Sequence, residues 1–428
     1  MVHRNVGFKA ASLLGGKLPI GLFALTLFAL TLFILALPGI ALAAAPTQCE
    51  ASDQGMRPDS DDNIAALNRA LSACAGRKIH IAAGVYDLNP KGFATGLVVP
   101  TGTTIVGDGH EGPDQTVLRV TNGGTFAAVF WIRNASNISI RGLRFEGSSY
   151  ESGCTRHLDY GHAIYVYSDQ AQRAGVESVT IADNAFHDFN GQSWITINAQ
   201  PGSPGIGQAS QIDISNNVFE SDADLQGGCS GTGGIGYPTA MVWLHGSDVS
   251  AQGLVSNVSV ASNAFNAGFV KSAVAIWSGT RLISVQYNVV RDAGLWLPPA
   301  PGTELGRYAV LIYNSAHDSV RELAGLHPDS ISVIGNEITN PVSCGIYVAR
   351  GRNLDISSNR ISGQRDRFDG TLPKGAIALN HADSVLSLKD NELSDNYIAI
   401  SSVGSQLNLG ANRITVPSGG SATKIVHD

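Results

Sequence analysis

The chain has 428 residues, of which 43% are apolar, 15% are charged and 49 are glycine. This composition excludes a disordered chain and one built mainly of exposed helices, and it is typical of an ordered protein with many turns. A formal charge of −7 argues against nucleic acid as a partner.

The first 43 residues have the pattern of a secretory signal peptide. Basic residues at positions 4, 9 and 17 precede a long apolar run that closes on the small-residue sequence ALA at positions 41–43. The alternative is a retained membrane anchor, because the run is long for a signal peptide. No second run of membrane length follows, so we expect a secreted or periplasmic protein without membrane insertion after cleavage. The mature chain carries 25 basic and 35 acidic residues, a formal charge of −10.

All five cysteines lie in the exported part, where disulfides form. Cys49 with Cys74 and Cys154 with Cys229 are the pairs we consider, although spacing alone does not fix the connectivity. Cys344 precedes a strand-like run and is expected to be a buried thiol rather than a nucleophile. The cysteines do not have the spacing of a zinc site.

One short phrase recurs along the chain, with the rule apolar-x-apolar-x-x-Asn-x-apolar. Its Asn stands at positions 184, 217, 263, 288, 336, 359, 391 and 412, and an earlier copy has Leu143 at that place. Alternation indicates a strand with one buried face, and an Asn at a fixed offset indicates a tight bend. Successive copies are 21 to 48 residues apart, with a minimum near 21 to 25. A fixed minimum with variable insertions predicts a solenoid of stacked coils.

A second strand family follows each copy, for example AIYVY from Ala163 and GIYVA from Gly345. Its alternate residues, such as Ile164 and Val166, are aliphatic and are expected to point into the core. Coils stacked at about 4.8 Å would place the recurring Asn residues above one another as a hydrogen-bonded ladder.

These features resemble the single-stranded right-handed parallel β-helix of the pectin lyase-like superfamily. The segment Asp59 to Leu88 is similar to the short capping helix and first strand of polygalacturonase-like and tailspike-like members, with Ile64, Leu67 and Leu71 as its apolar stripe. The resemblance implies that the signal peptide at 1–43 is followed by an all-β fold, with an N-terminal cap and first coil at 44–100 and a β-helix at 101–428. The subfamily is not assigned, because the motifs of polygalacturonases, calcium-dependent pectate lyases and mannuronan epimerases are absent or incomplete.

In this superfamily the binding groove lies along the second strand family and its loops. Alternation predicts two outward columns there: Tyr167, Asn198, His245, Trp277, Tyr313, Ala349 and Asn380, and beside them Tyr165, Thr196, Trp243, Ala275, Leu311 and Tyr347. Aromatic rings among amides suit sugar rings, which offer C–H faces and hydroxyl edges. The alternative is that loops cover these rings as a minor core. The expected substrate contacts are Tyr165, Tyr167, Trp194, Asn198, Trp243, Trp277, Arg281, Glu304, Arg307, Tyr313, Tyr347 and Arg350.

Glycosidic-bond hydrolysis requires two carboxyl groups, one as acid and one as base or nucleophile. Asp159, Asp188, Asp222 and Asp248 serve adjacent coils in the centre of the groove, and we expect the catalytic pair among them. His245 points outward on the central column and is a further catalytic candidate. Alternation turns His162 inward, as a buried ring.

A lyase or epimerase acting on a uronate polymer is the second hypothesis. It needs a base and a cation that holds the developing enolate, for which Lys271 and Arg281 bracket one strand. The third hypothesis is a non-catalytic surface or adhesin β-helix. We expect a polysaccharide or oligosaccharide partner and no cofactor. The Asp residues of Ser221–Gln226 leave calcium open, but they lack ligand spacing. The sequence is compatible with a homo-oligomer.

Overall fold

The computed structural model describes residues 48–89, 96–121, 128–147, 161–169, 175–189, 193–199, 207–221, 238–246, 253–295, 307–314, 326–366, 374–405 and 407–426. All of them belong to one compact unit, Gln48–Asp428. The predicted signal peptide lies outside the described residues and stays a prediction. In the described part, no helix is long and apolar enough to cross a membrane.

Three parallel sheets, each of 11 strands, make up the unit. Sheet A contains β1 (Gln48–Glu50), β2 (Lys78–Ile81), β5 (Thr104–Gly107), β8 (Ser136–Arg141), β11 (Val176–Ala182), β14 (Gly207–Ser215), β17 (Gly253–Ala261), β20 (Thr280–Gln286), β23 (Asp329–Ile334), β26 (Leu354–Ser357) and β29 (Val385–Lys389). Sheet B contains β3 (Gly84–Leu88), β6 (Thr116–Val120), β9 (Arg144–Glu146), β12 (Ala185–His187), β15 (Val218–Glu220), β18 (Ala264–Asn266), β21 (Val289–Arg291), β24 (Glu337–Thr339), β27 (Arg360–Ser362), β30 (Glu392–Ser394) and β32 (Arg413–Thr415). Sheet C contains β4 (Leu97–Val98), β7 (Ala128–Arg133), β10 (His162–Ser168), β13 (Ser193–Ala199), β16 (Ala240–His245), β19 (Ser272–Ile276), β22 (Tyr308–Tyr313), β25 (Cys344–Ala349), β28 (Gly375–Asn380), β31 (Ile398–Val403) and β33 (Ser421–Val426).

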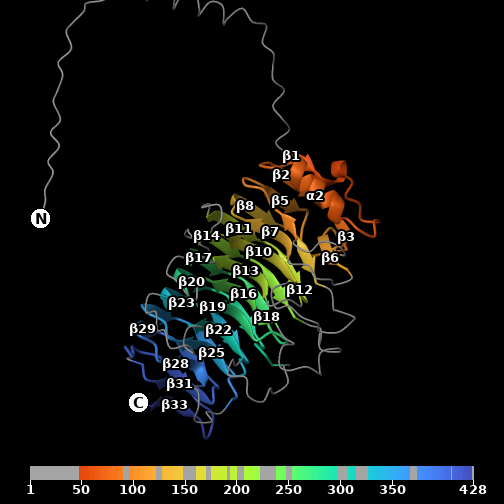
Figure 1. Cartoon of the computed structure of the whole chain (residues 1–428). Coiled ribbons are helices and arrows are strands. Elements are labelled where there is room, and N and C mark those ends of the chain that lie inside the picture. Colours follow the sequence, from red (N-terminus) through yellow and green to blue (C-terminus); the bar gives the residue numbers. More distant parts are fainter. Residues whose placement is uncertain are drawn as a thin grey trace, which may run out of the picture. The chain divides into compact units, whose positions relative to one another are not determined.

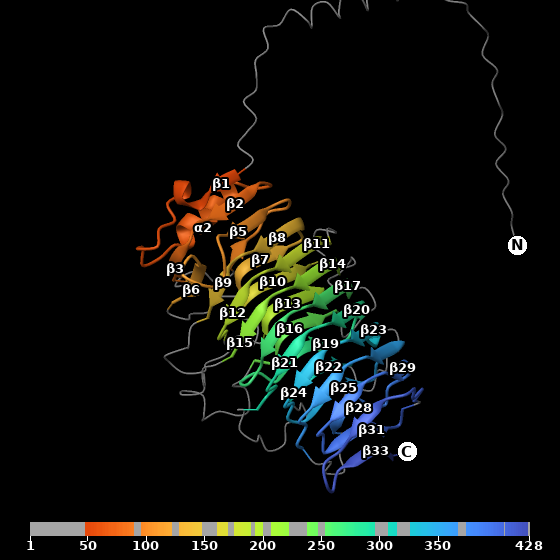
Figure 2. The same ribbon diagram turned by 180° about the vertical axis from the view of Figure 1, so that it is seen from behind.

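Each coil visits sheets A, B and C in turn, so a strand pairs with the strand one coil away rather than with its neighbour in sequence (Figure 1). The recurring phrase supplies sheets A and B, and the second strand family supplies sheet C. Figure 2 shows the same stack of coils from behind, running from the red N-terminal end to the blue C-terminal end. The architecture is a right-handed parallel β-helix, as predicted.

The predicted Asn ladder joins sheets A and B. Each amide nitrogen from Asn184 to Asn391 donates to the amide oxygen of the next Asn at 2.9 to 3.1 Å. The same oxygen also accepts from the backbone N–H of the preceding Asn, for example Asn359 N–H to Asn391 at 2.9 Å. Leu143, which replaces the first Asn, donates its backbone N–H to Asn184 at 3.1 Å. The bend therefore has no unpaired amide from Asn184 to Asn391.

From Asn184 to Asn391, the residue before each ladder Asn adopts a left-handed conformation, which turns the chain from sheet A into sheet B. Asp183, for example, has φ of 56° and Gly335 has φ of 68°. At Gly335 a side chain is excluded sterically as well, because a Cβ would lie 2.6 Å from the ring of Tyr287.

The core is filled by columns of like residues on successive coils. Phe145, Phe186, Phe219 and Phe265 stack with ring centroids 4.6 to 5.0 Å apart. The aliphatic positions predicted to point inward in sheet C, such as Ile164 and Val166, are fully buried. Near the end of the stack the repeat loses its register. A bulge between Leu354 and Asp355 in the pairing of β26 with β29 brings Val385 into the core and leaves Leu386, at the expected core position, 59% exposed.

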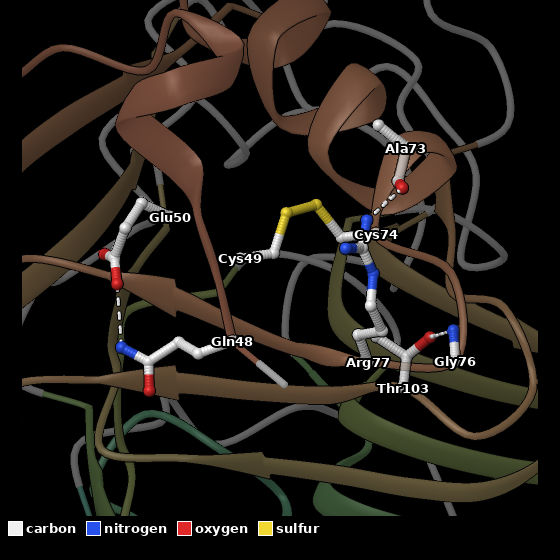
Figure 3. The surroundings of a disulfide bond; sticks show 8 residues. All are labelled: Gln48, Cys49, Glu50, Ala73, Cys74, Gly76, Arg77 and Thr103. Atoms are coloured by element: carbon white, nitrogen blue, oxygen red, sulfur yellow. Dashed lines mark hydrogen bonds between the residues drawn. A yellow bond between two sulfur atoms is a disulfide. The ribbon is translucent and has the colours of Figure 1, made fainter. Parts of the chain in front are cut away.

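The first coil is capped by the 3-10 helix η1 (Ala51–Gln54) and by α2 (Ile64–Ala73), whose Ile64, Leu67 and Leu71 are buried as predicted. A disulfide joins Cys49 of β1 to Cys74, directly after α2 (Figure 3). This confirms one predicted pair. Cys154 and Cys229 lie outside the described residues.

Candidate functional site

The outward columns of sheet C have the predicted register. Tyr165 pairs with Thr196, which pairs with Trp243, and this column continues through Ala275 and Leu311 to Tyr347. Beside it, Tyr167 pairs with Asn198 and Asn198 with His245. Parallel in-register pairing therefore collects side chains from coils far apart in sequence on one face, along the strands labelled β7 to β28 in Figure 1.

A third outward column lies at the start of the sheet C strands, where simple alternation fails. Ala163 and Ile164 both lie in the core, so the chain turns there and His162 falls outside, with its ring stacked on Tyr165 at 5.1 Å. The ring is 2% exposed, and its Nδ1 donates to the Ser193 carbonyl at 2.5 Å. The prediction that His162 is buried is confirmed, but its predicted inward direction is wrong.

The N-terminal end of this face carries a cluster of rings. Trp131 stacks on Tyr165 at 6.4 Å and lies equally far from Tyr167. Arg133 lies over the Trp131 ring at 5.2 Å and donates to Asp169 at 2.7 Å from Nε. The cation is therefore held against the ring from the edge of the face.

The central cluster contains Trp243, His245, Trp277 and Tyr313. The His245 ring stacks on Trp243 at 4.9 Å and meets Trp277 edge-on at 5.5 Å, and Tyr313 lies 5.5 Å from Trp277. Trp243 and His245 are 6% and 7% exposed. The aromatic residues and the histidine that the sequence predicted for the outward columns therefore contact one another in this cluster.

The C-terminal part of the face has an aromatic pair, Tyr308 and Tyr347, stacked at 4.7 Å. Asn380 on the next coil donates to the Tyr347 hydroxyl at 3.1 Å. Cys344 is fully buried in the same outer cluster, and burial raises the pKa of its thiol to about 12. The thiol is buried, as predicted.

Several polar atoms on this face are buried without a hydrogen-bond partner among the described residues. They are the ring nitrogens of Trp131, Trp243 and Trp277, the amide oxygen of Asn198 and the hydroxyl of Ser272. A buried, unpaired polar atom costs about 1–3 kcal/mol, so a polar ligand that pairs these atoms on the face would be stabilised there.

Two basic residues line the edge where the chain enters sheet C. Lys271 and Arg307 stand directly before β19 and β22, and Tyr308 N–H donates to the Lys271 carbonyl at 2.8 Å. Burial lowers the pKa of Lys271. Arg307 donates from Nη1 to the Gly294 carbonyl at 3.3 Å. Arg350 directly follows β25 in a left-handed conformation, with φ of 64°.

Of the four predicted catalytic carboxylates, the structure describes Asp188. It follows β12, is 7% exposed and lies 3.2 Å from Nδ1 of His187. Asp159, Asp222, Asp248 and Glu304 lie outside the described residues, so no carboxylate pair is established. Among the described residues, no group of three His, Cys, Asp or Glu side chains could hold a metal ion.

Two of the predicted substrate contacts do not lie on the outer face of sheet C. Trp194 points into the core, where it is fully buried and donates from Nε1 to the Phe189 carbonyl at 2.7 Å. It stands next to Ile195 at the same turn that moves His162 outward. Arg281 lies on sheet A, because only Trp277, Ser278 and Gly279 separate β19 from β20, and its side chain is exposed there.

Sequence reasoning missed Trp131, Arg133 and Tyr308. The strand AVFWIR, Ala128–Arg133, precedes the first copy of the repeat, so no aligned Asn pointed to it. Tyr308 has the parity of core residues Val310 and Ile312, and only the turn at the start of the strand brings it outside. The signal that could have found these residues is the aromatic side chain itself at the start of a sheet C strand.

Comparison with known proteins finds relatives by structure alone: no family model and no curated protein matches the chain. The Streptococcus pneumoniae surface protein and adhesin PfbA has a TM-score of 0.58 at 14% identity, over 88% of this chain and 99% of that one. The GH136 lacto-N-biosidase from Eubacterium ramulus has a TM-score of 0.54 at 11% identity, over 89% of this chain and 66% of that one. Together with the three parallel sheets, these similarities identify the chain as a right-handed parallel β-helix protein.

Proposed function

We propose that the outer face of sheet C binds an extended glycan and that the protein is an exported carbohydrate-active enzyme. The observation that carries the proposal is the combination of aromatic rings with buried, unpaired polar atoms on this face. Trp277 illustrates it: its ring is partly exposed, and its ring N–H has no acceptor among the described residues.

Sugar units fit such a surface chemically. Their C–H faces pack on aromatic rings, and their hydroxyl groups both donate and accept hydrogen bonds. The indole N–H groups of Trp131, Trp243 and Trp277 would donate to sugar oxygens, while the amide oxygen of Asn198 would accept from a hydroxyl. The face extends over many coils, so a chain of sugar units is a better match than a single small molecule.

The chemistry we propose is cleavage or rearrangement of a glycosidic bond by a carboxylate pair drawn from Asp159, Asp188, Asp222 and Asp248. One carboxyl group protonates the leaving oxygen, and the other acts as base or nucleophile. The buried position of Asp188, at the entrance to sheet C one coil below the Trp243 cluster, supports its inclusion. Aromatic residues on both sides would hold the sugar chain across that coil.

A second candidate is a lyase or epimerase that acts on a uronate polymer with Lys271 as the base. Removal of a proton beside a carboxylate needs a base that is unprotonated at the working pH. The lowered pKa of Lys271, caused by its burial, favours the neutral amine. This observation is specific to Lys271 and is independent of the carboxylates.

The test incubates the purified protein with a glycan panel and follows reducing ends, ultraviolet absorbance of unsaturated uronides and product masses together. New reducing ends without absorbance support hydrolysis, and absorbance supports the lyase. Mass spectrometry detects a transferase with cyclic products or an epimerase. If none of these signals appears but the tryptophan fluorescence changes, the protein is a binding module, as in the adhesin hypothesis. If reducing ends, absorbance, product masses and tryptophan fluorescence all stay unchanged, glycan recognition is refuted.

Single variants then place the chemistry. Each of Asp159, Asp188, Asp222 and Asp248 is replaced by Asn in turn, and we expect two of these four variants to lose cleavage. Lys271→Met should abolish the lyase reaction only. Asp395→Asn serves as the matched control, because Asp395 is an exposed carboxylate paired with Arg365 on the sheet B side. Full cleavage in all four Asp variants would refute the proposed pair.

A further inference from the structure

A pair of polar residues lies where the chain leaves sheet C for sheet A, outside the aromatic face. The imidazole Nδ1 of His327 contacts a carboxylate oxygen of Asp383. His327 is 6% exposed, and its other ring nitrogen, Nε2, is buried without a partner in the described part of the chain. A buried imidazole with one satisfied and one unsatisfied nitrogen calls for an additional partner.

The contact with Asp383 fixes the tautomer of His327. A carboxylate only accepts hydrogen bonds, so the proton of the neutral ring is on Nδ1 and the lone pair is on Nε2. Asp383 is itself held in place, since its backbone N–H donates to the Gly351 carbonyl at 2.9 Å. In its neutral form, His327 therefore presents a fixed hydrogen-bond acceptor at Nε2.

Arg352 supplies a donor on the neighbouring coil. Its backbone N–H donates to the Pro328 carbonyl at 2.8 Å, one residue after His327. One terminal nitrogen lies 3.6 Å from Asp329, whereas Nε is buried and has no partner among the described residues. Asp329 also accepts from Asn353 at 2.7 Å, which holds the arrangement in position.

This place adjoins the aromatic face. The Leu326 carbonyl, one residue before His327, accepts from the N–H of Gly279 at 2.8 Å. Gly279 follows Trp277 by two residues. His327 and Arg352 thus lie on the rim beside the Trp277 column.

We propose that His327 and Arg352 form a rim subsite that binds a hydroxyl group of the glycan. The hydroxyl oxygen accepts from Arg352 Nε–H, and the hydroxyl proton is donated to His327 Nε2, so both unpaired atoms are satisfied. A neutral hydroxyl fits better than an anion, because an anion would bring lone pairs against the Nε2 lone pair. This subsite rests on the proposed glycan-binding function, and Asp383 is its positioning residue.

The test measures binding of a cello-oligosaccharide, an oligogalacturonate and a chito-oligosaccharide by tryptophan fluorescence, with the full-length mature protein. His327→Phe removes the acceptor and keeps a ring, and Arg352→Lys removes Nε–H and keeps the charge beside Asp329. We expect each variant to bind the probe that wild type binds with an affinity lower by about threefold to tenfold. Arg360→Lys is the matched control, because Arg360 pairs with Glu392 on sheet B, away from this rim; it should bind like wild type.

Nitrogen-15 NMR of the imidazoles gives a second, direct readout. We expect His327 to show Nδ1–H without ligand and its Nε2 resonance to move when the probe binds. Two outcomes overturn the rim subsite alone. One is that the rim variants bind the probe within twofold of wild type. The other is that the Nε2 resonance does not move although the fluorescence shows that the probe is bound. If no probe changes the fluorescence, the proposed function fails and the subsite with it.

Discussion

Asn198 donates from its amide nitrogen to the hydroxyl of Tyr165 on the preceding coil, at 3.1 Å, while its amide oxygen is buried without a partner among the described residues. Asn380 and Tyr347 repeat the same amide-to-hydroxyl contact at 3.1 Å. In both pairs an amide fixes the edge of an aromatic ring on the outer face of sheet C. The Asn198 pair additionally leaves an acceptor for a ligand.

The first prediction concerns that acceptor. Asn198→Leu should weaken glycan binding by about threefold to tenfold, because one hydrogen bond and the anchor of Tyr165 are lost. Stability should change by less than about 1 kcal/mol, since the unpaired oxygen disappears with the amide. Titration with the glycan identified in the panel measures the first effect, and urea unfolding the second. Asn408→Leu, at an exposed amide near the end of the stack, is the control. Unchanged affinity in Asn198→Leu would remove Asn198 from the site.

The second prediction concerns the ladder. Asn359→Ala removes the acceptor of two donors, the backbone N–H and the side-chain amide of Asn336, which lie 3.0 and 2.9 Å from it. It should lower the free energy of unfolding by about 1–3 kcal/mol and leave the glycan chemistry intact. Urea unfolding and the cleavage assay check the two statements. Asn408→Ala again serves for comparison, and a stability equal to wild type would contradict the structural role of the ladder.

The third prediction separates two tryptophans with opposite roles. Trp194→Ala should cost about 3–5 kcal/mol, because it empties a core position between Phe189 and Phe219. Trp277→Phe removes an N–H that has no acceptor among the described residues, so stability should stay within about 1 kcal/mol while glycan binding weakens. Thermal unfolding and fluorescence titration distinguish the cases. The reverse pattern, with binding lost in a stable Trp194 variant, would restore Trp194 as a contact.

The repeat made most of the fold predictable. Asn359 was assigned to a ladder from its spacing alone, and the columns through Tyr165 and Asn198 followed from alternation with period two. Alternation failed for His162, Trp194 and Tyr308, because the turn into each sheet C strand sends two consecutive residues into the core. That turn depends on packing between coils and leaves no mark in the hydrophobic pattern. The positions of Asp159, Asp222 and Asp248 could not be derived from the sequence for another reason: an Asp in a long insertion has no repeat to fix its position.

The fourth prediction is a pH dependence of the N-terminal coils. His80 lies between two carboxylates, with Nδ1 2.6 Å from Glu50 and Nε2 2.7 Å from Asp108. Burial lowers the pKa of His80, but the hydrogen bonds to Asp108 and Glu50 outweigh it and the net pKa is raised above 6.5. The pKa of Asp108 is lowered, first by its hydrogen bond to His80, and that of Glu50 by hydrogen bonds from Gln48 and His80. Lys78 and Tyr86 are the other titratable groups that interact with this pair of carboxylates.

The signs follow from linkage. The raised pKa of His80 gives stability that is fully present below pH 6.5 and is lost as the pH rises through the folded-state value. The lowered pKa values of Glu50 and Asp108 give stability that is present above 4.5 and 3.8 and is lost on acidification. The contribution of this bridge to the melting temperature should therefore be largest between the acidic loss caused by Glu50 and Asp108 and the alkaline loss caused by His80. His80→Gln should remove the alkaline decline, whereas a profile identical to wild type would show that the bridge contributes nothing.

The last prediction concerns Lys271, whose role divides the two enzymatic candidates. Because burial lowers its pKa, the dimethylated side chain should titrate below a dimethylated lysine in a model peptide when followed by carbon-13 NMR. If the protein is a lyase, the rate should rise with pH through the same midpoint, since the neutral amine is the base. Lys271→Arg keeps the positive charge but holds its proton, so it should abolish elimination while leaving glycan binding within about threefold. If the protein is a hydrolase that uses a carboxylate pair, Lys271→Arg should retain cleavage, and the NMR midpoint should not appear in the rate profile.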